Sequence, residues 1–246
     1  MGAVAWRIHH SRETVSTNID AANGLHGDVY TADWQSGGRG RLDHRWFSPP
    51  GVNLLMSAVL SVEGVSDIDV ATFPLVVGLA VARAVEPFSR RFSGAGPKVK
   101  WPNDVLVDGR KVAGILCERH GGVVAAGVGV NVRRQSFPRE IAARAAFLGD
   151  VQVEEVRDRV LEELAECWGK WRESGFAAIF PEVFALDFLK GKHVCVRQTD
   201  GDSSPVSGLS NGIMCDGSLD VGGVRVYAGE AHVEGAAFMN MEGWKE

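Results

Sequence analysis

The sequence has few cysteines, no long uninterrupted apolar run and no excess of positive charge. None of its four cysteines belongs to a C-x-x-C pair, so a zinc site or a disulfide framework is not expected. The most apolar run, residues 70–85, is interrupted by Thr72, Pro74 and Arg83 and is too short to cross a bilayer. Residues 1–7 lack the apolar core of a signal peptide. These absences predict a soluble protein of the reducing cytoplasm that does not contact a membrane.

Several common site motifs are absent as well. The formal net charge is −5 and the pI is about 5.8, so no overall basic field would attract nucleic acid. The sequence contains no Walker A loop, no G-x-G-x-x-G turn before a helix and no serine nucleophile elbow. His9 and His10 are adjacent and would point to opposite faces of a strand, which does not favour a shared metal. Classical P-loop, dinucleotide-binding and serine-hydrolase sites are therefore not expected.

Glycine, in contrast, is abundant, and three of the 30 glycines lie together at Gly37, Gly38 and Gly40. Glycine lets the backbone approach a ligand closely, and successive backbone N–H groups can form an anion-binding nest. Arg39 and Arg41 add guanidinium groups that suit carboxylate or phosphate oxygens. On this evidence alone an anion site, a mobile surface loop and an RGG-like RNA contact all remain open.

Apolar spacing and capping residues predict several helices. Ser16 or Thr17 can cap the first of them, because a hydroxyl accepts from the unpaired N–H groups at a helix start. Apolar residues that recur every three or four positions from Val153 predict one face of a helix, which Gly175 would end. The predicted helices cover, in chain order, residues 13–25, 70–85, 153–174 and 176–189.

The remaining segments predict β-structure in two separate regions. Residues 98–132 form short apolar runs separated by turn signals such as Asp108-Gly109. Consecutive hairpins make neighbouring strands antiparallel, so we predict an α+β fold whose mixed, largely antiparallel sheet is flanked by helices. After Gly191, short alternating strands and frequent turns indicate a separate small β-barrel. We place the domain boundary near residue 190, with a main domain over 1–189 and the mini-barrel over 190–246.

Three further segments carry polar groups, glycines or both. Residues 100–104, K-W-P-N-D, bring a cation, an indole, a rigid turn, an amide and a carboxylate together, although a packed β-turn explains them equally well in isolation. Lys111 and Gly114 lie on the far arm of the following hairpin, where Gly114 lets another group approach the strand closely. Gly127 and Gly129 alternate along one strand face, which can form a pocket floor without side chains.

Taken together, these motifs resemble those of the bacterial biotin protein ligases, which attach biotin to a lysine of a carboxylase carrier domain. The resemblance covers residues 16–132, in the family's order, with a weaker match in the C-terminal region. The residues that carry it are Ser16-Thr17-Asn18, Gln35, Gly38-Arg39-Gly40-Arg41, Trp46, Lys100-Trp101-Pro102-Asn103-Asp104, residues 109–116 and Gly129-Val130-Asn131. It implies a catalytic domain like those of class II synthetases and biotin ligases, followed by an SH3-like β-barrel.

The resemblance also implies a role for each matching position. The catalytic residues would be Lys111 and Arg41. The biotin contacts would be Ser16, Thr17, Asn18, Gln35, Gly38, Arg39, Gly40, Arg41, Lys111 and Gly114. The ATP contacts would be Arg39, Arg41, Trp46, Asn103, Lys111 and Asn131, and Asp104 would orient the site or bind Mg²⁺. Neutral hydroxyl and amide groups suit the uncharged ureido ring of biotin, whereas the cations suit its carboxylate and the nucleotide phosphates.

The implied reaction has two steps and needs a protein partner. Biotin and Mg·ATP would form biotinyl-5′-AMP with release of pyrophosphate, and the biotinyl group would then pass to a lysine of a biotin carboxyl carrier protein with release of AMP. Some members of the family carry an N-terminal winged-helix domain and bind an operator. Only 15 residues precede Ser16, so we expect no such domain and no nucleic-acid partner. A homodimer is left open.

The sequence departs from the family at two places, and two alternatives remain. Between Arg41 and Trp46 the residues are L-D-H-R, where relatives are often richer in arginine and glycine. In the C-terminal region, the arginine that some members have shortly after Gly229-Glu230 is missing, and Glu234 lies in that neighbourhood. A lipoate or octanoate ligase on the same scaffold would need a narrow apolar tunnel, which the polar Ser16 and Gln35 do not favour. A non-catalytic biotin-binding protein would not need the cations of a phosphate clamp.

Overall fold

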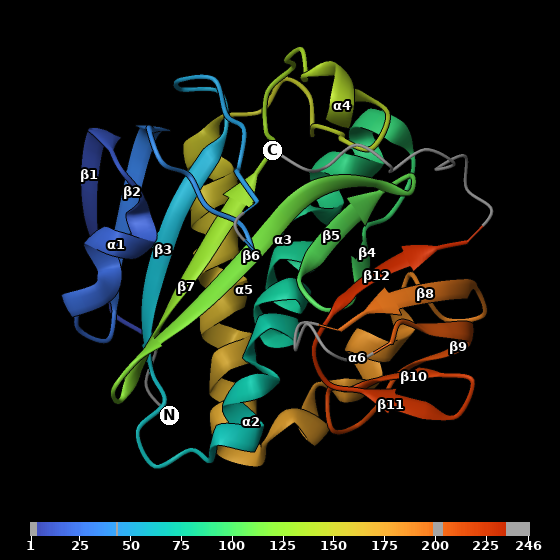
Figure 1. Ribbon diagram of the computed structural model, residues 1–246. Coiled ribbons are helices and arrows are strands. Elements are labelled where there is room, and N and C mark those ends of the chain that lie inside the picture. Colours follow the sequence, from blue (N-terminus) through green and yellow to red (C-terminus); the bar gives the residue numbers. More distant parts are fainter. Residues whose placement is uncertain (1–3, 43, 199–203, 235–246) are drawn as a thin grey trace.

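The centre of the protein is a seven-stranded sheet in the order β1-β2-β3-β7-β6-β5-β4 (Figure 1). The structure is a computed structural model that describes residues 4–42, 44–198 and 204–234. The strands are β1 Arg7–Thr14, β2 Asp28–Gln35, β3 Leu54–Ser61, β4 Lys98–Lys100, β5 Asp104–Val107, β6 Arg110–His120 and β7 Val123–Val130. Strands β1 and β2 run parallel, and the other neighbouring pairs are antiparallel. The predicted α+β fold with a mixed, largely antiparallel sheet is confirmed.

Two long helices, α3 and α5, pack against each other and cover one face of this sheet (Figure 1). The α-helices are α1 Thr17–Asp20, α2 Asp67–Ala71, α3 Phe73–Ser93, α4 Arg139–Ala142, α5 Val153–Ser174 and α6 Phe180–Ala185. Two 3₁₀ turns, Ala21–Asn23 and Phe176–Ala178, extend α1 and precede α6. The end of α5 at Gly175 is as predicted, and Gly175 has a φ of 72°.

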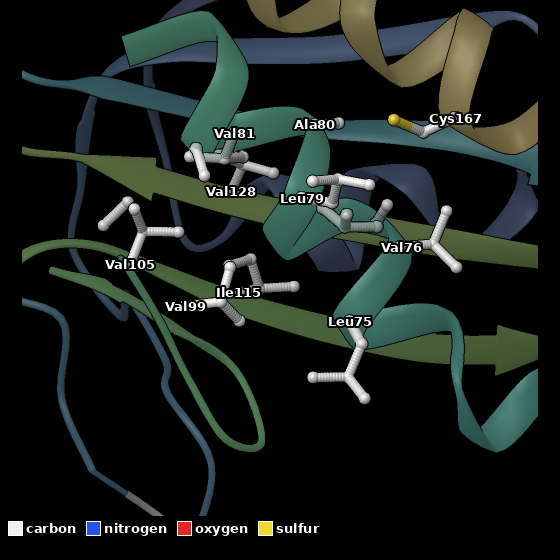
Figure 2. Packing of buried hydrophobic residues seen from close by; sticks show 14 of the residues in the cluster. Leu75, Val76, Leu79, Ala80, Val81, Val99, Val105, Ile115, Val128 and Cys167 are labelled. Carbon is white, nitrogen blue, oxygen red and sulfur yellow. The ribbon is translucent and has the colours of Figure 1, made fainter. Parts of the chain in front are cut away.

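The main hydrophobic core lies between α3, α5 and the sheet. Figure 2 shows Leu75 and Leu79 of α3 together with Ile115 of β6 and Val128 of β7, which are buried residues of one hydrophobic cluster. Because α3 is covered by the sheet on one side and by α5 on the other, it is apolar around most of its circumference. Pro74 lies in its first turn, where the missing N–H leaves no helical bond unmade.

Residues 67–93, which comprise α2 and α3, are the one helical stretch in the described ranges that is long and apolar enough to cross a membrane by length and composition. The stretch is longer than the apolar run at 70–85, so the prediction that this segment is too short to span was wrong about its length. In its most apolar window 67% of the residues are buried inside the protein. Burial of this extent places the stretch in the core of the protein.

The first predicted helix is much shorter than the sequence pattern indicated. Strand β1 continues to Thr14, which pairs with Gln35 of β2 in the parallel ladder. Only Thr17–Asp20 is α-helical, and Ser16 occupies the N-cap position without a capping bond from its side chain. The pairing of β1 with β2 therefore overrides the local helical preference of residues 13–15.

The helix predicted over 176–189 is also interrupted. It ends at Ala185, because the following residues add to the sheet beside β4. Val99 donates its N–H to the carbonyl of Leu186 at 2.9 Å, and Phe188 donates to the carbonyl of Val99 at 2.8 Å. These two bonds occupy the carbonyl of Leu186 and the N–H of Phe188, whereas the N–H of Leu186 still donates to the carbonyl of Glu182.

The C-terminal strands form a second, five-stranded antiparallel sheet in the order β11-β10-β9-β8-β12. The strands are β8 His193–Arg197, β9 Val206–Ile213, β10 Leu219–Val221, β11 Val224–Val226 and β12 Glu230–Val233. Within the described residues β11 and β12 each pair with one neighbour, so the ladder is open and a closed barrel is not confirmed. Trp101 Nε1 donates to the carbonyl of Gly217 at 3.0 Å, which attaches this sheet to the main one.

Candidate active site

The candidate site lies on the face of the main sheet opposite α3 and α5, where β6 and β7 carry glycines instead of side chains. Gly114 and Gly129 are direct partners across these strands. A Cβ on Gly127 would lie 2.3 Å from Asn18 Oδ1, and a Cβ on Gly129 would lie 2.6 Å from Trp46 Cε2. Asn18 and Trp46 thus rest directly on the backbone, in space that any larger residue would fill. The strand face without side chains that the glycine spacing predicted is present, and we refer to it as the floor of the candidate site.

A buried cluster of neutral polar groups covers one end of this floor. Thr17 donates its N–H and its hydroxyl to Gln35 Oε1, at 2.7 and 3.1 Å. Ser57 Oγ lies 2.8 Å from Thr17 Oγ1 and 2.5 Å from Asn18 Oδ1. Asn18 Nδ2 donates to the carbonyl of Leu116 at 3.1 Å. Helix α1 and strands β2 and β3 contribute the side chains of this polar cluster, which we define as Thr17, Asn18, Gln35 and Ser57.

The polar cluster has fewer hydroxyl protons than contacts. Three oxygen–oxygen contacts link Gln35, Thr17, Ser57 and Asn18. Each hydroxyl carries one proton, so Thr17 and Ser57 together supply two protons for these three contacts. One close contact between oxygens is therefore left without a proton. A ligand that brings N–H donors would supply the missing proton, whereas an apolar ligand would leave the contact unsatisfied.

The glycine-rich loop folds back as a small hairpin and places Trp46 on the floor. Trp46 donates its N–H to the carbonyl of Gly38 at 3.0 Å, and Gly40 donates to the carbonyl of His44 at 2.6 Å. The indole Nε1 of Trp46 is buried and has no hydrogen-bond partner among the described residues. A buried donor without a partner is costly, so this N–H is available to a ligand acceptor.

The two arginines of the loop do not converge on one point. Arg39 Nη2 lies 3.1 Å from both carboxylate oxygens of Glu118 on β6. Arg41 Nη1 donates to the carbonyl of Gly229 in the C-terminal sheet at 3.0 Å. Burial lowers the pKa of Arg41, although a guanidinium remains charged in any such environment. In this structure the two guanidinium groups therefore bind different protein acceptors, one on β6 and one directly before β12.

A group of charged side chains lies at the other end of the floor. Lys111 Nζ is 2.6 Å from Asp104 Oδ1 and 5.7 Å from the ring centre of Trp46. The contact with Asp104 is not aligned as a hydrogen bond, so we treat it as an ion pair. Burial lowers the pKa of Lys100, while the carboxylates of Asp104 and Glu230 oppose that lowering. Positive charge is thus concentrated beside Gly114, whose hypothetical Cβ would lie 3.1 Å from Lys111 Nζ.

The remaining predicted residues mainly position β6. Asn103 Nδ2 donates to the carbonyl of Ile115 at 2.8 Å, and Asn131 Nδ2 lies 3.5 Å from the carbonyl of Lys111. Ser16 is buried beside the polar cluster. Asp104 was predicted as a possible metal ligand. In the described part of the chain, no group of three or more His, Cys, Asp or Glu side chains that could hold a metal occurs.

Two residues of the site were missed by the sequence reasoning, Ser57 and Glu118. Ser57 is the one polar residue within the apolar run at 54–60, and a hydroxyl there signals a buried partner. Glu118 follows Gly114 and Leu116 at alternate positions of one strand, so it shares their face. The sequence shows this alternation. It does not show the partners of Glu118, because Asn18 and Arg39 are 100 and 79 residues away in the chain.

The comparisons with known proteins agree with this geometry. A profile of the biotin/lipoate A/B protein ligase family matches residues 7–134. The biotin–[acetyl-CoA-carboxylase] ligase of Mycobacterium tuberculosis is 34% identical over 233 residues, which are 89% of this chain and 85% of that protein. The bifunctional ligase/repressor of Bacillus spizizenii is 33% identical over 156 residues; the match covers 60% of this chain and 46%, about half, of that longer protein.

A solved structure shows the same fold with ligands. The biotin protein ligase of Aquifex aeolicus, in complex with biotin and ATP, superposes with a TM-score of 0.79 and 26% identity. The superposition covers 92% of this chain and 97% of that one. From the profile match, the coverage of its relatives and the shared fold, the chain belongs to the biotin/lipoate A/B protein ligase family.

Proposed function

We propose that this protein is a biotin ligase. It activates biotin with Mg·ATP as biotinyl-5′-AMP and transfers the biotinyl group to a lysine of a biotin carboxyl carrier protein. The observation that carries the proposal is the polar cluster of Thr17, Asn18, Gln35 and Ser57, which lacks a proton for one of its contacts. A cyclic urea offers two N–H donors and one carbonyl acceptor without a charge, which matches such a cluster.

The polar cluster at one end of the floor and the cations at the other end would set the orientation of the bound ligand. The ureido ring would bind Thr17, Asn18 and Gln35, with Ser16 beside them, and the chain would run over Gly114 toward Lys111. The carboxylate would then lie among the cations, where the glycine-rich loop, residues 38–41, can close over it. Trp46, Asn103 and Asn131 would contact the nucleotide, together with Arg39, Arg41 and Lys111.

Electrostatic stabilisation is the main catalytic requirement of the first step. The carboxylate oxygen of biotin attacks the α-phosphorus of ATP, the bond to the bridging oxygen breaks, and pyrophosphate leaves with its electron pair. Two anions must approach each other, so positive charge fixed where negative charge develops lowers the barrier. Lys111 provides this charge, and its ion pair with Asp104 at 2.6 Å holds the ammonium in place beforehand.

The second step consumes the mixed anhydride. A neutral lysine amine of the acceptor attacks the acyl carbon, an amide bond forms, and AMP leaves with the phosphoryl oxygen. Because water would also attack the anhydride, the loop that carries Arg39 and Arg41 must cover it until the acceptor arrives. The contact from Arg41 to Gly229 supports a closed position in which the C-terminal sheet forms part of the cover.

Magnesium enters as part of the substrate Mg·ATP. Mg²⁺ is commonly held by nucleotide phosphates, waters and one or two carboxylates, so a full cage of protein ligands is not required. Asp104 is the carboxylate nearest to Lys111 in the site and is mostly buried. We propose that it orients Lys111 first and contacts the metal second.

The wider assignments follow from this function. We propose that residues 1–189 form the catalytic domain and that residues 190–246 form an SH3-like domain that helps to close the site. The protein would act in the cytoplasm on a carboxylase carrier domain, without nucleic acid or membrane, and a homodimer is compatible with this role.

The experiment measures pyrophosphate release from Mg·ATP with biotin, with lipoate and with neither. Biotin-dependent release is expected, because the dithiolane ring of lipoate has no N–H donor to complete the polar cluster. Release that depends on lipoate instead would assign the protein to the lipoate branch of the family. Tight biotin binding without pyrophosphate release would indicate a non-catalytic binder and would contradict the mechanism.

A further inference from the structure

The carboxylate of Glu118 contacts groups from both halves of the site. Asn18 Nδ2 donates to Glu118 Oε2 at 2.6 Å, and Arg39 Nη2 lies 3.1 Å from each Glu118 oxygen. Asn18 belongs to the polar cluster on helix α1, whereas Arg39 belongs to the glycine-rich loop. A single side chain on β6 therefore joins the groups proposed to bind the two ends of biotin.

The contact with Asn18 fixes which way its amide points. Nδ2 donates both to Glu118 and to the carbonyl of Leu116, so both of its protons are used. Oδ1 then faces Ser57 at 2.5 Å. An amide turned by 180° would place Oδ1 against the Glu118 carboxylate, where two acceptors would repel. Glu118 thereby keeps the polar cluster in one arrangement.

The contact with Arg39 is of a different kind, because it depends on charge. A guanidinium binds a carboxylate through charge-assisted bonds, and the carboxylate of a substrate offers it the same chemistry as Glu118. A second anion brought to Arg39 would also be repelled by the negative charge of Glu118. The side chains of Arg39 and Glu118 remain 47% and 29% exposed, so water screens their ion pair. Replacing Glu118 by another carboxylate at Arg39 therefore costs little free energy.

We propose that Glu118 is a positioning residue that holds Arg39 as an internal counter-ion until the substrate carboxylate displaces it, and that it keeps Asn18 aligned for the neutral ring at the same time. This inference rests on the proposed function. It assigns to Glu118 two separable effects: one on the binding of the ligand's charge and one on the binding of its ring.

Two substitutions separate these effects. Glu118→Gln keeps an oxygen that accepts from Asn18 but removes the charge that holds Arg39. Glu118→Ala removes both contacts. Asp67→Asn is the matched control, because Asp67 is an exposed carboxylate paired with Arg119, the next residue along β6, outside the polar cluster.

The measurement is the Kd of biotin and of biotinol, its neutral alcohol analogue, by titration calorimetry with wild type and the three variants. Glu118→Gln is expected to lower the Kd of biotin by about 1.5- to 5-fold, the range of an exposed ion pair, and to leave the Kd of biotinol unchanged. Glu118→Ala is expected to raise the Kd of biotinol, because the amide of Asn18 loses its alignment. Asp67→Asn is expected to change neither.

A double-mutant cycle tests whether the effect passes through Arg39. With Arg39→Gln in place, adding Glu118→Gln should no longer change the ratio of the two dissociation constants, since no guanidinium is left to release. If the ratio still changes by the same factor, Glu118 acts by direct repulsion of the ligand and not as a counter-ion of Arg39.

The outcomes distinguish this inference from the proposed function. If wild type binds both ligands but Glu118→Gln weakens them equally, Glu118 is only structural and the inference is wrong while the function stands. If wild type binds neither ligand, the proposed function is wrong and the inference falls with it.

Discussion

The indole of Trp46 occupies the space that Gly129 leaves open. A Cβ at residue 129 would lie 2.6 Å from Trp46 Cε2 and 2.9 Å from Nε1, closer than real Cβ contacts. The loop that carries Trp46 and the strand that carries Gly129 are more than 80 residues apart in the chain. Their contact explains why a glycine is needed near the end of β7, although glycine within a strand otherwise weakens the sheet.

Gly129→Ala should therefore impair adenylation more than folding. The added methyl group displaces the indole, which belongs to a loop and can move, so the free energy of unfolding should change little. A catalytic group displaced by about 1 Å can cost roughly 100-fold in rate, and we expect biotin-dependent pyrophosphate release to fall by about 10-fold or more. Gly169→Ala on α5, where a Cβ meets nothing within 4 Å, is the control. It should leave activity unchanged and raise stability by about 0.5–1 kcal/mol. Equal activity in both variants would contradict a role for the Trp46 position.

Ser57→Ala should weaken biotin binding. The substitution removes the hydroxyl that contacts Thr17 and Asn18 and leaves Asn18 Oδ1 without its donor. An Asn18 amide that is no longer held by Ser57 loses its alignment for the ureido ring, and one ligand group left unpaired costs about 1–3 kcal/mol, so the Kd of biotin by calorimetry should rise by about tenfold. Ser61→Ala, at the end of the same strand and with an exposed hydroxyl contact, should bind as wild type does. Unaltered biotin affinity in Ser57→Ala would contradict the proposal that the polar cluster binds biotin.

Arg41→Gly should release the reactive intermediate. The substitution removes the bond from the loop to the carbonyl of Gly229, which holds the loop against the C-terminal sheet. Biotinyl-5′-AMP would then escape and label lysines of bystander proteins, which a blot for biotin detects in a mixture with an inert protein. Arg45→Gly in the same loop is the control, because its side chain is exposed. If labelling by Arg41→Gly stays confined to the carrier lysine, Arg41 does not retain the intermediate.

Asp28→Asn should lower stability at neutral pH but not in acid. Burial opposes the ionisation of Asp28, but hydrogen bonds from His9, the N–H of Leu25 and Arg7 outweigh it and hold its pKa at about 2. A folded-state pKa below the ordinary aspartate value of 3.8 means that ionised Asp28 stabilises the fold above about pH 4. That contribution, about 1–2 kcal/mol after allowance for its exposed partners, is lost as the pH falls toward 2.

Urea unfolding of wild type and Asp28→Asn at a series of pH values measures this difference. The gap in unfolding free energy between the two proteins should be constant from about pH 5 to 7 and should close between about pH 4 and 2. A gap that stays the same across that interval would show that Asp28 does not stabilise the fold through its charge.

The sequence predicted those parts of the site that depend on local pattern. The hairpin around Asp108-Gly109, the alternate glycines Gly127 and Gly129, and the position of Lys111 follow from turn chemistry and strand periodicity, and the structure has each of them as expected. The short first helix was not predicted, because the pairing of Thr14 with Gln35 depends on a strand that comes later in the chain.

The partners of the charged side chains could not be predicted either. Arg39 and Arg41 were expected to hold the carboxylate of biotin and the nucleotide phosphates. Their protein partners, Glu118 for Arg39 and the carbonyl of Gly229 for Arg41, were not expected. Both contacts join segments that are distant in sequence, and they require the register of β6 and the placement of the C-terminal sheet. Local sequence shows that a guanidinium is available but does not show which acceptor it meets.

The transfer of biotin to a carrier lysine tests the central claim most directly. A biotin carboxyl carrier domain is incubated with biotin, Mg·ATP and either wild type or Lys111→Ala, and its intact mass is followed over time. We predict one biotinyl group on one lysine with wild type. With Lys111→Ala the rate should fall by about 10- to 100-fold or more, because one charge-assisted bond to the reacting anions is lost. No mass change with wild type, or an equal rate with Lys111→Ala, would contradict the mechanism.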